Sequence, residues 1–129
     1  MDFGARVLRG SATLTLERAP GADELLLDGR DLAIERVEGF AGPRASGDGA
    51  ARGSALAFEV DRPTAGGGDG PVLGDRIRVR LAPDTRRVRI VYTTSPEASG
   101  LLWLAPEQTD GGDAPYLFSQ AQEIHARSF

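Results

Sequence analysis

Residues 76–92 read RIRVRLAPDTRRVRIVY, and apolar and charged side chains alternate in both halves of this stretch. A period of two places successive side chains on opposite faces of a β-strand. In Arg76–Leu81 the apolar side chains therefore face a core and the arginines face outward. In Arg87–Tyr92 every second residue is again apolar. The stretch predicts two half-buried strands.

Alternation or a short apolar run recurs along the rest of the chain. It predicts further strands at Ser11–Glu17, Glu24–Asp28, Leu32–Val37 and Ala55–Val60. Val37 falls out of step with Leu32 and Ile34, so we expect a β-bulge there. No stretch of about 12 residues carries the 3.6-residue apolar period of a helix. About seven or eight short strands predict an all-β, antiparallel sandwich or barrel.

The composition excludes several kinds of site. The 129 residues contain no Cys and one His, which excludes a disulfide framework, a thiolate site and a site with two His ligands. The net charge of −4 disfavours nucleic acid, because phosphate binding needs a basic surface. The apolar runs are far shorter than the roughly 20 residues of a membrane helix. We therefore expect one domain, residues 1–129, with neither nucleic acid nor a membrane as its partner.

Outward-facing arginines form the first candidate site. A row of them on consecutive predicted strands either binds an anion or is a solvated face paired with nearby carboxylates, and the second interpretation is favoured. The row consists of Arg76, Arg78, Arg80, Arg87 and Arg89.

Three other motifs offer little support for catalysis. His125 has no second ligand type near it in sequence, so a structural role is favoured over a base or a metal ligand. Ser119 lies outside any Gly-x-Ser-x-Gly turn, which gives no support for a serine hydrolase. Thr64–Gly70 contains three successive glycines but no following Lys-Ser/Thr, so it predicts a surface loop and not a phosphate-binding loop.

Gln120 and Gln122 form the last candidate. On an extended segment, side chains two residues apart point the same way. Two amides supply donors and acceptors together, which suits a peptide backbone or terminus. From composition alone, two exposed glutamines without a function are the favoured interpretation.

A family resemblance over residues 100–127 makes a function for the two glutamines the favoured interpretation. The strings WLAPEQT (residues 103–109) and PYLFSQAQEIHAR (residues 115–127) resemble the zinc aminopeptidases of peptidase family M1, and most of all the leukotriene A-4 hydrolase branch. Earlier segments follow the order of that family's N-terminal β-domain. The resemblance implies a saddle-shaped, sandwich-like antiparallel domain. It also implies that the chain is a fragment, inactive alone, which lacks the catalytic domain that binds zinc.

The resemblance also implies a role for the two glutamines. In the family, a loop at the end of the β-domain reaches the catalytic cleft, and its Gln-x-Gln segment matches Gln120 and Gln122. Gln122 takes the position that helps hold the free α-amino group of the peptide substrate, and Gln120 contacts the substrate near its first residue. Other branches carry Glu at the Gln122 position. No catalytic residue, metal ligand or cofactor is expected in this chain itself.

The resemblance implies a docking surface as well. A domain that packs on a catalytic domain of the same parent chain leaves apolar side chains bare. The candidates are Leu101, Leu102, Trp103, Tyr116, Leu117 and Phe118, with Trp103 equally well placed in the core. The branch suggests the cytoplasm. The alternative is a free-standing β-sandwich interaction module without peptidase activity.

Overall fold

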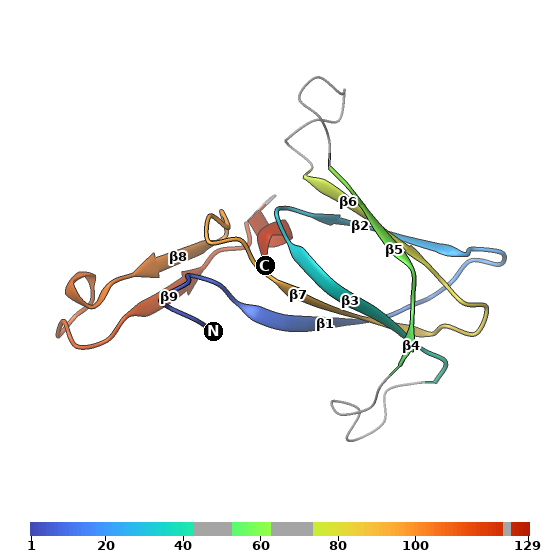
Figure 1. Ribbon diagram of the computed structural model, residues 1–129, viewed down its shortest axis with the longest axis horizontal. Coiled ribbons are helices and arrows are strands. Elements are labelled where there is room, and N and C mark those ends of the chain that lie inside the picture. The colour runs from blue at the N-terminus through green and yellow to red at the C-terminus, as the bar shows by residue number, and fades with distance from the viewer. Residues whose placement is uncertain (43–52, 63–73, 123–124) are drawn as a thin grey trace.

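Two antiparallel sheets pack face to face, and a third, two-stranded sheet extends from one end (Figure 1). The computed structural model describes residues 1–42, 53–62, 74–122 and 125–129. The first sheet has the order β1 (Arg9–Thr15), β7 (Arg87–Thr93), β3 (Ala33–Phe40), β4 (Ser54–Ala55). The second has the order β2 (Glu24–Gly29), β6 (Asp75–Arg80), β5 (Phe58–Asp61). This arrangement confirms the predicted all-β antiparallel fold.

The core lies between the two larger sheets. Val37 of β3 and Val88 of β7 meet Val79 of β6, and all three side chains are almost completely buried. Ile77, Leu81 and Ile90 complete the buried cluster. The apolar positions of the alternating stretch at residues 76–92 therefore face inward as predicted, on strands from both sheets.

The bulge expected in the third strand is present. The register of β3 against β7 shifts between Ile34 and Arg36, so Glu35 is the extra residue. Glu35 and Arg36 are both exposed, and this brings Val37 back to the core side. The Glu35 carboxylate accepts a hydrogen bond of 3.0 Å from the Thr93 hydroxyl on the neighbouring strand.

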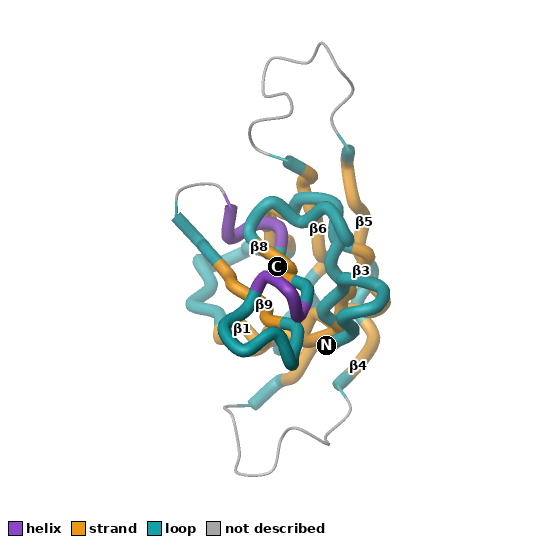
Figure 2. The backbone as a smooth tube through the Cα atoms, turned by 90° about the vertical axis from the view of Figure 1, so that its left-hand side faces the viewer, coloured by secondary structure: helices purple, strands orange, loops and turns teal. Residues whose placement is uncertain are grey.

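The third sheet is a hairpin of β8 (Leu101–Leu104) and β9 (Tyr116–Ser119). It carries a 3-10 turn, η1 (Pro106–Gln108), at its far end, which is nearest the viewer in Figure 2. A second 3-10 turn, η2 (His125–Ser128), follows it in the chain and lies where the hairpin meets the two sheets (Figure 1). No helix formed by the described residues has the length and hydropathy to cross a membrane. The predicted loop Thr64–Gly70 lies outside the described residues.

Candidate functional site

The two glutamines lie side by side just after β9. The Gln120 side-chain amide donates a hydrogen bond of 2.7 Å to Oε1 of Gln122, and both residues are exposed. The prediction that the two side chains point the same way is therefore confirmed. Among the described residues, Gln122 Oε1 has no second donor and the Gln122 side-chain amide has no acceptor, so one lone pair and both N–H groups remain for a ligand. The pair thus offers an acceptor and donors together to a ligand from solvent.

Backbone contacts hold this segment at the base of the hairpin. The Gln120 N–H donates to the Gly100 carbonyl at 2.9 Å, directly beyond the last pair of the ladder, Leu101 and Ser119. The Gly100 N–H donates to the buried Ser128 hydroxyl at 3.0 Å. Sequence reasoning missed Gly100 and Ser128, because no local pattern predicts a contact between residues 28 apart.

His125 and Ser119 form no catalytic arrangement with each other in the structure. His125 Nδ1 lies 3.0 Å from the hydroxyl of Ser99, next to the hairpin base. Ser119 pairs with Leu101 in the sheet. Glu123 and Ile124, part of the string that carries the family resemblance, lie outside the described residues.

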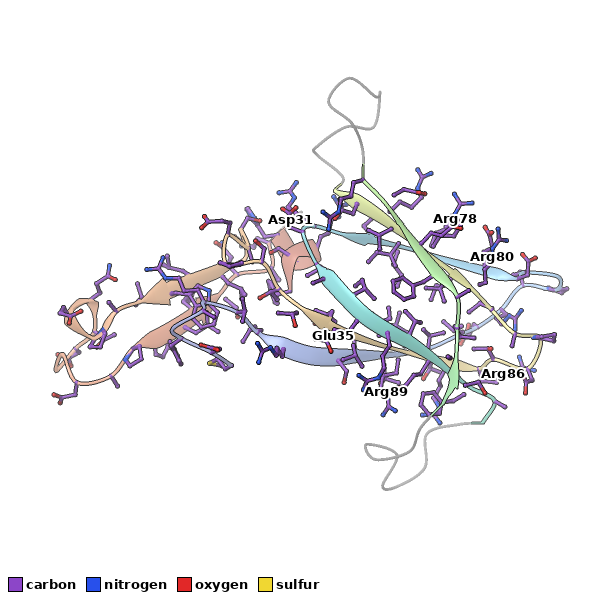
Figure 3. The ribbon with its side chains drawn as sticks, viewed as in Figure 1. Asp31, Glu35, Arg78, Arg80, Arg86 and Arg89 are labelled. Atoms are coloured by element: carbon purple, nitrogen blue, oxygen red, sulfur yellow. The ribbon has the colours of Figure 1, made fainter. Side chains whose placement is uncertain are left out.

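The arginine row does not exist as one surface, which corrects part of the prediction. Its members lie on β6 and β7, which belong to different sheets, and Figure 3 shows Arg78 and Arg80 on one side of the molecule and Arg89 on another. The side chains of Arg78 and Arg80 both pair with Glu24. Pairing with carboxylates, the plainer interpretation, is thus what the structure shows on β6.

Arg87 and Arg89 are not on a solvated face either. Arg87 is only 5% exposed, and its Nε donates to the Gly42 carbonyl at 2.8 Å. Arg89 Nε donates to the Glu38 carboxylate at 2.8 Å. Both guanidinium groups lie over the ring of Phe40, at 4.8 and 5.0 Å from its centroid. The prediction missed this because alternation gives the face of a side chain but not what covers that face.

One face of the hairpin carries exposed apolar side chains. Leu102 and Phe118 are paired across the two strands and are 55% and 50% exposed, and Tyr116 is 58% exposed. Leu101, by contrast, is buried. The expectation that some of the six candidate side chains are bare is therefore confirmed for Leu102, Tyr116 and Phe118.

Trp103 lies neither bare on a docking surface nor in the sandwich core, the two places predicted for it. It packs edge-on against Phe3, with ring centroids 5.3 Å apart, and it is half-buried and outside the sandwich core. Its Nε1–H is buried and has no acceptor among the described residues.

No zinc site is formed by the described residues. They contain no group of three or more His, Asp or Glu side chains arranged to hold a metal ion. The residues of the described ranges therefore do not fit a zinc centre.

Comparison with known proteins defines the class of this domain. The fold matches the yeast leukotriene A-4 hydrolase in complex with bestatin with a TM-score of 0.75 and 29% identity, over 98% of this chain and 18% of that one. The match to native leukotriene A-4 hydrolase from Saccharomyces cerevisiae has a TM-score of 0.74 and 30% identity. The chain thus has the fold of the N-terminal β-domain of leukotriene A-4 hydrolase.

Sequence relatives specify the relationship further. The chain is 35% identical to leucine aminopeptidase 2 of Yarrowia lipolytica and 32% identical to leukotriene A-4 hydrolase of Xenopus laevis, each over 99% of this chain. It spans 18% and 19% of the lengths of these two curated relatives. No family model matches the sequence. The chain is homologous to the N-terminal region of the leucine aminopeptidase 2 and leukotriene A-4 hydrolase proteins of the M1 family.

Proposed function

We propose that this domain positions the N-terminus of peptide substrates for a zinc aminopeptidase of which it forms part. One observation carries the proposal: two exposed, hydrogen-bonded amides, Gln120 and Gln122, stand on an anchored segment. The chain is also homologous to proteins named as aminopeptidases. The cytoplasm is the compartment that we propose for the parent protein.

The amide pair supports this role through ordinary hydrogen-bond chemistry. A peptide ammonium group is a donor, and the free lone pair of Gln122 Oε1 is an acceptor for it. Gln120 already occupies the other lone pair, which holds the Gln122 amide in one orientation. Fixing the ammonium sets which peptide bond meets the reacting groups, and such positioning removes several kcal/mol from a barrier.

The hydrolytic step is assigned to another part of the longer protein. Zinc in M1 enzymes supplies an activated water for peptide hydrolysis. Since the described residues of this domain fit no zinc site, the domain contributes position and not the nucleophile. We expect the chain alone to hydrolyse no peptide.

The bare hairpin face is the proposed contact with the catalytic domain. Leu102, Tyr116 and Phe118 lie together on a hairpin that extends away from the sandwich (Figure 1). Clustered apolar side chains in water mark an interaction surface. The relatives are about five times longer than this chain, so they contain ample polypeptide to cover such a face.

A domain exchange tests the positioning role. The region of Yarrowia lipolytica leucine aminopeptidase 2 that aligns with this chain is replaced by the chain, and hydrolysis of a leucyl arylamide is measured. We expect activity, with KM raised about tenfold by Gln122→Ala, the loss of about 1.4 kcal/mol of binding. The control is Gln108→Ala, on the far end of the hairpin. An active exchange protein whose KM is indifferent to both substitutions contradicts the proposal.

The size of the natural gene product tests the alternative. An antibody to the domain should detect a band several times larger than 13.6 kDa in the source cells. A band at 13.6 kDa instead supports the free-standing interaction module.

A further inference from the structure

Gly100 contacts both ends of the segment that carries the glutamines. Its carbonyl accepts from the Gln120 N–H at 2.9 Å, and its N–H donates to the Ser128 hydroxyl at 3.0 Å. The Ser128 hydroxyl donates in turn to the His125 carbonyl at 2.8 Å. Ser128 is completely buried, so water does not replace either bond.

Close packing adds to these hydrogen bonds. A Cβ at Gly100 would lie 2.4 Å from the ring of Phe129 and 2.9 Å from the His125 carbonyl oxygen. Only a residue without a side chain therefore lets the C-terminal turn approach β8 this closely.

The same turn is tied to the sandwich. The Arg30 N–H, just after β2, donates to the Arg127 carbonyl at 2.8 Å, and the Arg127 guanidinium lies 3.5 Å from the Asp28 carboxylate. The turn η2 thus joins the hairpin base to β2. The position of η2 therefore depends on its contacts with the sheet that contains β2 as well as on its contacts with the hairpin.

We propose that Gly100 and Ser128 are positioning residues. Together with Phe129 they form a clasp that ties the start of the glutamine segment, Gln120, to the C-terminal turn η2 and fixes the direction in which the Gln120–Gln122 pair is presented. The inference rests on the proposed function of that pair. Its physical basis is preorganisation: a loop already held in its binding conformation loses less entropy when it takes a ligand.

The test compares the ¹⁵N-labelled chain with Ser128→Ala, Ser128→Cys and the control Ser95→Ala. Ser95 also accepts a backbone hydrogen bond, but from Glu97, two residues further along its own segment. The readouts are hydrogen exchange of the Gln120 backbone amide and ¹⁵N relaxation of the Gln122 side-chain amide. A titration with the peptide Leu-Gly-Gly examines the proposed function separately.

We expect Ser128→Ala to speed Gln120 exchange about tenfold and to raise the mobility of the Gln122 amide, while exchange at Val79 and Val88 stays within about twofold. Ser128→Cys keeps the side-chain shape and a weak donor and acceptor, so it should be intermediate and stay folded even if the alanine variant does not. Ser128 variants that match Ser95→Ala at both glutamines overturn the clasp. Failure of Leu-Gly-Gly to shift the Gln122 amide contradicts the proposed function and leaves the exchange result standing.

Discussion

At the scale of single residues, the neutral charge of Gln122 is the property with the clearest consequence. A carboxylate at that position would form a charge-assisted hydrogen bond with a peptide ammonium, roughly twice as strong as the neutral bond of an amide. In the proposed role an amide gives a weaker anchor, so the parent enzyme should require a free peptide N-terminus less strictly than branches that carry Glu at this position.

Replacing Gln122 by Glu should therefore tighten ammonium binding. In the exchange protein described above, we expect Gln122→Glu to lower KM for a leucyl arylamide about tenfold, or ~1.4 kcal/mol. The matched control is Gln108→Glu, which adds the same charge elsewhere. An unchanged or higher KM for Gln122→Glu would sink this interpretation.

The buried pair of Arg89 and Glu38 makes a second prediction at this scale. Their side chains are only 12% and 10% exposed. Loss of Arg89 leaves the poorly solvated Glu38 carboxylate with the more distant and exposed Arg36, at 3.6 Å, as its remaining cation among the described residues. We expect Arg89→Leu to lower the free energy of unfolding by about 3 kcal/mol, measured by urea denaturation. The double variant with Glu38→Leu should recover much of that loss.

Arg80 supplies the control for this pair. It also pairs with a carboxylate, that of Glu24, but its side chain is 57% exposed. Exposed ion pairs contribute about 0–1 kcal/mol, so Arg80→Leu should change stability little. Equal losses for Arg80→Leu and Arg89→Leu would show that burial does not control the outcome.

At the scale of elements, the strands were predictable because alternation is a local property. Apolar positions such as Ile77, Val79 and Leu81 identify a strand and its inward face without any knowledge of its neighbours. The order in which strands pair in a sheet, by contrast, depends on segments far apart in the chain. The consecutive strands β6 and β7 belong to opposite sheets, so the expectation of one shared arginine face was wrong.

The candidate site likewise has one part that the local sequence predicts and one part that it does not. The adjacency of Gln120 and Gln122 follows from their spacing, and the structure confirms it. Their attachment to Gly100 and Ser128 depends on tertiary contacts between segments 28 residues apart, for which a single sequence carries no signal.

Gly74, the residue directly before β6, is the subject of the third prediction. Gly74 has φ +78°, and a Cβ there would lie 2.3 Å from the Gly29 carbonyl oxygen. We expect Gly74→Ala to destabilise the protein by more than about 2 kcal/mol, from left-handed strain together with a displaced β2. Thermal unfolding followed by circular dichroism measures this change.

Gly21 is the control that distinguishes backbone strain from steric crowding. It has φ +80° but open space where a Cβ would lie. Gly21→Ala should cost only about 1 kcal/mol, the strain alone. If both alanine variants unfold at the same temperature, contact with Gly29 is not what constrains residue 74.

At the scale of the whole molecule, the hairpin face should behave as an interface and not as part of the core. The double substitution Leu102→Ser and Phe118→Ser removes apolar surface that is already half in water, so the free energy of unfolding should change by less than about 1 kcal/mol. The same change should reduce binding of an apolar dye and weaken association with the catalytic part of the exchange protein, supplied as a separate chain.

The outcome for Leu101 provides the comparison. Leu101 belongs to the same strand but is buried, so Leu101→Ser should destabilise the domain by about 2–4 kcal/mol. A large loss of stability in the Leu102/Phe118 variant would mean that these side chains serve folding and not contact with a partner.

The pairing of β1 with β7 has a consequence for synthesis on the ribosome. Leu8 and Thr94, which exchange hydrogen bonds beside this ladder, are 86 residues apart in the chain. At roughly 5–20 residues per second, the first strand waits roughly 4 to 17 seconds for its partner to be made. During that interval its edge is unpaired and open to wrong partners. We therefore expect the nascent domain to misfold or aggregate less when its first strand is shielded until residue 93 has left the exit tunnel.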